Sequence, residues 1–250
     1  PGGDYVVSTI TPYVAEMLVA AKDAGFEPPA QLLERTLKRL EDDLLAGGNA
    51  HYDYDYSEHL RLAEMMQAGY VLARQKRAPL GTLRALYDND SSKLIAPLPV
   101  VHLGVALQLM GDTERGSKAI TLIANEPIDS FQSDSIETYR EWCSGHGMEP
   151  RVIMSKSPMP DDAAVAAAAA LAGDSRPDAV YATVDTLAKA VIDQAGRQGI
   201  ELPGQLRIAT CSDSHSASSA TSSGEPTRPS GSVAPMLGRT SAPNTCGEIM

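Results

Sequence analysis

Two aspartates at the ends of expected strands are the side chains best placed to do chemistry in the second half of the chain. Asp185 follows the apolar run 179–183, and Asp213 follows the run 206–211. A carboxylate at the carboxyl end of a parallel strand is well placed to accept hydrogen bonds from the hydroxyl groups of a small ligand. The alternatives are a helix cap for Asp185, a common role for Asp, and an ordinary loop position for Asp213. Both interpretations stay open.

Three further patterns could support chemistry, and each has a plainer interpretation. Residues 213–215 are Asp, Ser and His, but neighbours in sequence lack the geometry of a catalytic triad, and no Gly-x-Ser-x-Gly elbow precedes them. Segment 51–59 holds histidines and carboxylates that suit a divalent metal. We interpret it as a loop leading into a helix, where acidic residues are favourable. Cys143, Cys211 and Cys246 form no Cys-x-x-Cys pair. We therefore expect no enzyme, metal site or cofactor.

Composition excludes several classes of partner. The 250 residues carry 21 Lys and Arg against 32 Asp and Glu, a formal net charge of −11, which opposes binding to a phosphate backbone. A basic helix-turn-helix is also missing, so we expect no direct DNA binding. No apolar run approaches the roughly 20 residues of a membrane span, and no signal-peptide pattern opens the chain. The first residue is Pro1, which suggests a fragment.

The elements that would position these residues change character along the chain. From Thr9 to about Met110 the apolar residues recur at helical spacing, which predicts an all-α helical array. Beyond about residue 115, short apolar runs alternate with helical segments, which predicts an α/β lobe with a parallel sheet covered on both faces. The expected strands are 120–124, 152–154, 179–183 and 206–211.

The last part of the chain differs from both halves. Residues 212–250 include 10 serines and are otherwise rich in Thr, Gly and Pro, a composition that cannot bury enough apolar surface to offset the entropy of ordering. We therefore expect a disordered, low-complexity tail. The predicted division is 1–114 for the helical part, 115–221 for the α/β lobe and 222–250 for the tail.

Several blocks in the first half resemble bacterial alpha-2-macroglobulins. They are ITPYVAE at 10–16, AGYVLAR at 68–74, APLGTLR at 78–84 and LPVVHLG at 98–104. The resemblance spans about residues 4–114. It implies part of the α/α-toroid that carries the thioester in a protein that traps attacking proteases. That thioester needs a Cys-x-x-Gln motif, which the sequence lacks, so we expect no covalent trapping.

Other blocks in the second half resemble the C-terminal lobe of LacI/GalR-type effector domains. They are RGSKAITLI at 115–123, YREW at 139–142, RPDAVYA at 176–182 and GIELP at 199–203. The resemblance spans about residues 115–221. It implies a Rossmann-like, three-layer lobe of the periplasmic-binding-protein type. In that family a sugar or nucleobase effector held between two lobes controls DNA affinity.

The family's ligand residues carry over in part. Asp185 matches a family Asp, and Asp213, preceded by Ser rather than Asp, keeps one carboxylate of a common pair. Ser135 stands where the family often has Arg, and Val184 stands where it often has Asn. Phe131 could supply an apolar wall. The predicted ligand-binding residues are thus Phe131, Ser135, Asp185 and Asp213, and the ligand itself stays open.

Together these resemblances predict an apparent chimera. The leading expectation is the part of a LacI/GalR-type transcription regulator that binds a small sugar-like or nucleoside-like effector, without its helix-turn-helix. The alternative is an alpha-2-macroglobulin protease-inhibitor fragment without its thioester, or an inactive fusion product. The regulator interpretation implies the cytoplasm, and a macroglobulin parent implies the periplasm. We expect the sheet to pack on its own, with the helices in a separate arc, and exposed lobe faces to allow a homo-oligomer.

Overall fold

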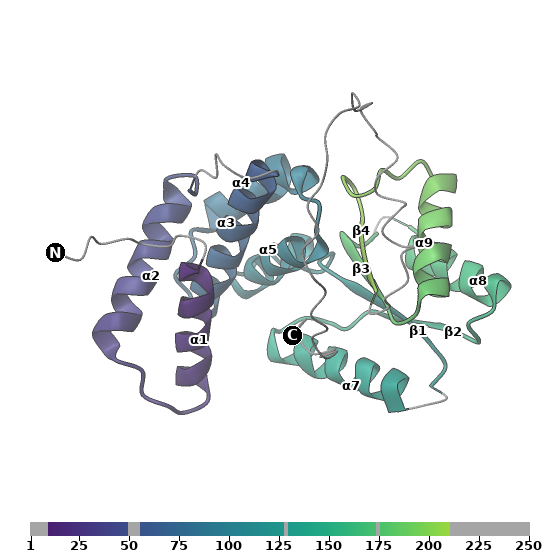
Figure 1. Ribbon diagram of the computed structural model, residues 1–250, viewed down its shortest axis with the longest axis horizontal. Helices are drawn as coiled ribbons and strands as arrows, with labels where there is room; N and C mark the ends of the chain where they lie inside the picture. Colours follow the sequence, from purple (N-terminus) through teal and green to yellow (C-terminus); the bar gives the residue numbers. More distant parts are fainter. Residues whose placement is uncertain (1–9, 50–55, 128–129, 174–175, 211–250) are drawn as a thin grey trace, which may run out of the picture.

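The computed structural model describes residues 10–49, 56–127, 130–173 and 176–210 (Figure 1). The predicted tail at 222–250 and the candidate Asp213 lie outside these residues. Helices of the first half occupy one end of the molecule, and a small sheet flanked by helices occupies the other. Within the described ranges, no helix is both long enough and apolar enough to cross a membrane.

The first half is helical, as its apolar spacing predicts. Its elements are α1 (Thr11–Asp23), α2 (Ala30–Leu45), α3 (Ser57–Arg74), α4 (Leu80–Asp90), the 3-10 turn η1 (Ser91–Lys93) and α5 (Pro97–Leu109). In α2 a stripe of leucines at helical spacing is buried, including Leu37, Leu40 and Leu44. The solvent face of the same helix carries Lys38 paired with Asp42 at four-residue spacing. Apolar periodicity thus sets which face of the helix packs inward.

The second half is a four-stranded parallel sheet with connecting helices. Its elements are α6 (Thr113–Gly116), β1 (Thr121–Asn125), α7 (Ser130–Gly145), β2 (Val152–Ser155), α8 (Pro160–Ala170), β3 (Ala179–Ala182), α9 (Asp185–Arg197) and β4 (Arg207–Thr210). The strand order is β2-β1-β3-β4, and all three pairings are parallel. Every residue of β1 is buried, as expected for a central strand covered on both faces.

Helices cover both faces of this sheet and give three layers. Leu122 and Ala124 of β1 face the core that includes α5 and α7, while Ile123 faces the core formed with α8 and α9. This alternation follows from the two-residue period of a strand. The helices α8 and α9 lie together on one side of the sheet, and α7 lies on the other (Figure 1).

Helix α5 contradicts the expected separation of the two halves. It packs against α3 on one side and against β3 and β4 on the other. A helix sandwiched in this way must be apolar around its whole circumference, and residues 99–101 and 103–107 are all buried. At Gly104 an added Cβ would lie 2.3 Å from the Cβ of Ala119, so only glycine allows this close approach. One continuous apolar core therefore joins the helical array to the sheet.

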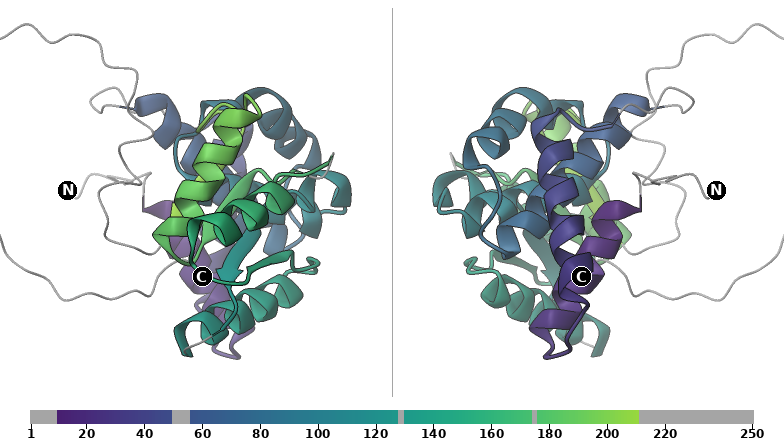
Figure 2. Two further views of the ribbon diagram at one scale, coloured as in Figure 1. Left: turned by 90° about the vertical axis from the view of Figure 1, so that its right-hand side faces the viewer. Right: turned by 90° about the vertical axis from the view of Figure 1, so that its left-hand side faces the viewer.

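Polar contacts cross the same junction. The imidazole of His146 at the end of α7 donates from Nδ1 to the carbonyl oxygen of Trp142 at 2.7 Å. Its Nε2 is therefore the acceptor for the hydroxyl of Tyr70 in α3, 2.9 Å away. Gln108 of α5 also donates to the carbonyl of Gly147 at 2.6 Å. The helical half and the α/β half thus contact each other through both apolar and hydrogen-bonded groups. Figure 2 shows the helices and strands of both halves from two further sides.

Candidate functional site

Polar side chains gather at the carboxyl end of the parallel sheet. Asn125 ends β1 and is only 5% exposed, and its Oδ1 has no hydrogen-bond partner in the described residues. Thr210 ends β4, and its Oγ1 is likewise buried without a partner there. A buried polar atom without a partner costs free energy. These two oxygens therefore mark places where a ligand or a water molecule would be stabilised.

Helix α7 is tied to this edge by a buried hydrogen bond. Thr183, the residue after β3, donates from Oγ1 to Oε1 of Gln132 at 2.8 Å. Gln132 is 4% exposed and occupies the first turn of α7, next to Phe131. Phe131 is 39% exposed. The bond ties the first turn of α7 to the residue after β3, and Phe131 in the same turn is partly exposed.

Asp185 opens helix α9 at the same edge. The N-cap position belongs to Val184, whose side chain makes no capping hydrogen bond, so Asp185 is the first helical residue rather than the cap. A carboxylate there is stabilised by the positive end of the helix dipole. Its Oδ1 atom is buried. The structure therefore holds this carboxylate in place by its position in the first turn.

The predicted ligand residues are only partly brought together. Phe131 and Asp185 lie in the first turns of α7 and α9, which begin after β1 and β3. Ser135 lies further along α7, about 6 Å from Phe131 along the helix axis at 1.5 Å per residue, and it is half-buried. Asp213 lies outside the described residues. Of the four, Phe131 and Asp185 lie in the first turns of helices at this edge, and a single site formed by all four stays a prediction.

Four polar residues of this edge escape the sequence-based prediction. They are Asn125, Gln132, Thr183 and Thr210. Asn125, Thr183 and Thr210 could be suspected because each ends or follows an apolar run. Gln132 gives no such signal, because a glutamine in a helix is usually exposed. With Asp185 these groups offer amide, hydroxyl and carboxylate oxygens, a set suited to hydrogen bonding with a polyhydroxylated ligand.

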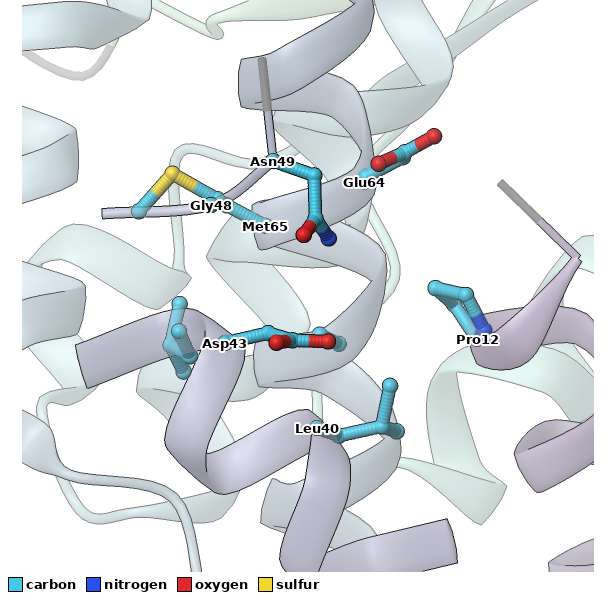
Figure 3. A pocket seen from close by; sticks show the side chains of 9 residues that line it. Pro12, Leu40, Asp43, Gly48, Asn49, Glu64 and Met65 are labelled. Carbon is cyan, nitrogen blue, oxygen red and sulfur yellow. The ribbon is translucent and has the colours of Figure 1, made fainter. Parts of the chain in front are cut away.

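A small cavity lies between the first three helices (Figure 3). Its volume is about 10 Å³, and side chains of α2 and α3 such as Leu40, Asp43 and Glu64 line it. Asp43 already pairs with Arg39, the Nε to Oδ2 distance being 2.7 Å. A space of this size holds about one water molecule, so it is not a site for an organic ligand.

The two described histidines of the first half, His59 and His102, each contact another group of the protein. Of the acidic segment 51–59, residues 51–55 lie outside the described ranges, and His59 accepts a hydrogen bond at Nδ1 from the amide of Ile95 at 3.3 Å. His102 stacks on Tyr70 with ring centroids 5.1 Å apart, and burial lowers its pKa to about 4. Across the ranges that the structure describes, no three His, Cys, Asp or Glu side chains are grouped to hold a metal ion.

Comparison with known proteins finds two kinds of similarity. Residues 113–227 match the family described as periplasmic binding protein-like domain. The alpha-2-macroglobulin of Xylella fastidiosa is 51% identical over 119 residues, which is 48% of this chain and 7% of that protein. The alpha-2-macroglobulin of Escherichia coli is 34% identical over 143 residues, 57% of this chain and 8% of that protein. The chain therefore spans less than a tenth of the length of these relatives.

Solved structures that are similar to this chain are also alpha-2-macroglobulins. A crystal structure of native alpha-2-macroglobulin from Escherichia coli, from domain MG7 to the C-terminus, is 36% identical over 45% of this chain and 18% of that chain. Its TM-score of 0.42 is too low to establish a shared fold. Residues 113–227 are thus similar to the periplasmic binding protein-like domain family, and about half of the chain is similar to alpha-2-macroglobulins.

Proposed function

We propose that the helical half is a scaffold segment of a bacterial alpha-2-macroglobulin that contacts proteases without covalent chemistry. The observation that carries this proposal is the 51% identity to the Xylella fastidiosa alpha-2-macroglobulin over 119 residues. The absence of a Cys-x-x-Gln motif from the sequence removes the thioester, so contact would be non-covalent. The related Escherichia coli protein has been solved in trypsin-activated and elastase-activated forms, which makes these proteases suitable probes.

The test uses the full chain and porcine elastase whose active site has been blocked with a covalent inhibitor. We expect the two proteins to co-elute on size exclusion, and we expect active elastase to form no adduct that survives denaturing electrophoresis. Bovine serum albumin in place of the chain is the control. Independent elution of elastase and the chain would refute the proposal, and a denaturation-resistant adduct would refute its non-covalent part.

A second candidate function is small-molecule binding of the LacI/GalR effector type at the carboxyl end of the sheet. It is favoured by the buried oxygens of Asn125 and Thr210, which have no hydrogen-bond partner among the described residues, and by the match of residues 113–227 to a periplasmic binding protein-like domain. Phe131 and Asp185 would supply an apolar wall and a carboxylate acceptor, as sugar-binding sites require. Ser135 and Asp213 remain predicted contacts.

Isothermal titration with glucose, galactose, ribose, adenosine and guanosine tests this second function. We expect heat of binding with at least one of them, and we expect Asn125→Ala to weaken that binding about tenfold, the effect of losing one good hydrogen bond. Asn89→Ala in α4 is the matched control, because Asn89 is exposed and, among the described residues, its side chain donates to the carbonyl of Ala85 in its own helix. Absence of heat from every compound would count against effector binding.

One chain is similar to two different families. This supports the further proposal that the chain is a chimera. The periplasmic-binding-protein-like match begins at residue 113, and the alpha-2-macroglobulin resemblance reaches about residue 114. Long-read sequencing of the source DNA tests whether one uninterrupted frame encodes both. We expect a break or junction near this point if the fusion is an assembly artefact, and many independent uninterrupted reads would show a genuine fusion. The compartment would follow the parent, periplasmic for a macroglobulin and cytoplasmic for a regulator.

A further inference from the structure

A second, larger pocket lies at the opposite edge of the sheet, where the strands begin. Its volume is about 670 Å³, which falls within the usual range of small-ligand sites, roughly 300 to 1,000 Å³. Its lining comes from α4, the connection before β1, the segment after α8, the segment before β3 and the end of α9. The residues are Tyr87, Lys118, Leu171, Ala172, Gly173, Arg176, Asp178 and Gln198.

The wall of this pocket is shared between the two halves of the chain. Tyr87 belongs to the helical half, and it donates a hydrogen bond from its hydroxyl to Oδ2 of Asp178 at 2.8 Å. The backbone amide of Asp178 donates to the carbonyl of Lys118 at 2.7 Å, and its carbonyl accepts from the amide of Arg207 at 3.1 Å. Arg207 in turn donates to the carbonyl of Ser91. These bonds hold the residues of the pocket floor in place. The floor therefore forms only where the helical half packs against the α/β half.

Two cations line the pocket, and the acidic group on which their charges act is Asp178 of the same pocket. Lys118 and Arg176 both line the pocket and are half-buried, and neither forms a salt bridge with a described residue. A guanidinium and an ammonium group facing one hollow are a suitable arrangement for an oxyanion, because charge-assisted hydrogen bonds are about twice as strong as neutral ones.

Asp178 adds a hydrogen-bond acceptor to this positive pocket. The Tyr87 hydroxyl occupies Oδ2, while no hydrogen bond from a described residue reaches Oδ1. The three ionised side chains give the pocket a net charge of +1, with a carboxylate oxygen left for a donor. An anion alone would be attracted by two cations and repelled by this carboxylate, whereas an anion that also bears a hydroxyl group would use all three groups.

We propose that this junction pocket binds a small oxyanion that carries a hydroxyl group, such as a phosphorylated polyol. Lys118 and Arg176 pair with the oxyanion, and Asp178 accepts a hydrogen bond from the hydroxyl. The site is separate from the carboxyl-edge site and from any protease contact, since it lies at the amino ends of the strands and requires Tyr87 of α4. Its ligand would bind only where both halves are packed together.

The charge on Asp178 gives the site a pH dependence. Burial raises the pKa of Asp178 to about 6, opposed by the Tyr87 hydroxyl and by the positive charges of Arg207, Lys118 and Arg176. Protonation of Asp178 below this pH removes the one negative charge that faces the ligand. Sulfate keeps the same charge between pH 5 and 8, so its affinity should rise as the pH is lowered from 7.5 to 5.5.

The experiment is isothermal titration of the full chain with sodium sulfate, glycerol 3-phosphate and glycerol. We expect glycerol 3-phosphate to bind more tightly than sulfate at pH 7.5, and glycerol to give no heat. Arg176→Gln and Lys118→Gln should each weaken glycerol 3-phosphate binding about tenfold, which corresponds to one charge-assisted contact. Arg140→Gln is the control, because Arg140 is exposed on α7 and carries the same charge.

Three outcomes would overturn the proposal. One is an absence of binding by the unaltered chain up to about 10 mM glycerol 3-phosphate, a concentration well above that expected for even a weak site. Another is equal weakening by Arg140→Gln, which would indicate general charge attraction. The third is unchanged binding in both pocket variants, with circular dichroism showing that they are folded. None of these outcomes bears on the sugar or elastase tests, so the proposals fail separately.

Discussion

Replacing Gly104 by alanine tests the contact through which α5 joins the two halves. The added Cβ would lie 2.3 Å from the Cβ of Ala119 and 3.1 Å from its Cα. Carbon atoms pack best at about 3.5 to 4.0 Å, so the helix or the strand entry must move by more than about 1 Å. Overpacking of this kind costs roughly 1 to 3 kcal/mol, against a gain of about 1 kcal/mol in helix propensity. We expect a net loss of stability of up to about 2 kcal/mol.

The matched control is Gly196→Ala in α9, where an added Cβ meets nothing within 4 Å. It should raise the free energy of unfolding by up to about 1 kcal/mol, because only the propensity effect remains. Urea unfolding followed by far-ultraviolet circular dichroism measures both variants. Combining Gly104→Ala with Ala119→Gly removes the closer of the two clashes, so the double variant should recover at least about 1 kcal/mol relative to the sum of the singles.

The reasoning is refuted if Gly104→Ala stabilises the protein as much as Gly196→Ala does. It is also refuted if the loss at Gly104 is additive with Ala119→Gly, because additivity is the behaviour of residues that do not touch. Either result would mean that α5 does not lie against the entry to β1.

Further predictions concern titration, the junction and the buried thiol. Burial lowers the pKa of His102 from 6.5 to about 4, so its contribution to stability is full above pH 6.5 and is lost as the pH falls toward 4. In the native chain this loss lowers the free energy of unfolding by roughly 3 kcal/mol, and His102→Leu should abolish it. Asp178 has the opposite sign, since its pKa is raised from 3.8 to about 6; stability should fall by about 3 kcal/mol as the pH rises through this window, and Asp178→Asn should abolish that fall in the same urea assay. Tyr87→Phe should cost about 1 to 3 kcal/mol, because it leaves the half-buried Asp178 carboxylate without its donor, and Tyr13→Phe on the exposed face of α1 should cost nothing measurable. In a variant with Cys211→Ser and Cys246→Ser, the buried Cys143 thiol, whose pKa is raised by burial, should react with a thiol reagent only at the rate of unfolding.

Helices and strands whose apolar residues follow one clear pattern were predictable from the sequence. The leucine stripe of α2 and the run that forms β1 each carry one dominant pattern, and the structure places both where the pattern indicates. The parallel sheet followed from the alternation of strands and helices. Local periodicity records which face of an element is buried, so these predictions needed no information about distant residues.

The packing of the halves on each other could not be predicted in this way. Helix α5 is apolar on all sides, so its sequence indicates burial but not which neighbours bury it. The bond from Tyr70 to His146 joins residues 76 positions apart, and nothing local marks either one as a partner of the other. The predicted separate arc of helices was therefore wrong, and the junction pocket that includes Tyr87 and Asp178 could not be anticipated.

The candidate site at the carboxyl end of the sheet was predictable in outline. Asp185 was identified because it matches an Asp of the LacI/GalR-type domains and follows an apolar run, and in the structure it opens α9 just after β3. Gln132 was missed because its burial depends on the bond to Thr183, 51 residues away. Residues that end a strand can be inferred from sequence, whereas a helix residue that turns toward them depends on the tertiary fold.

Hydrogen exchange followed by mass spectrometry tests most directly whether the two halves form one structure. The account predicts that the slowest amides of α3, α5, β1 and β3 open with the same free energy, equal to that of global unfolding, because a single core holds them. It also predicts that Gly104→Ala lowers all of them together. Protection in α3 that differs from that in β1 by more than about 2 kcal/mol, or that survives Gly104→Ala, would contradict the shared core.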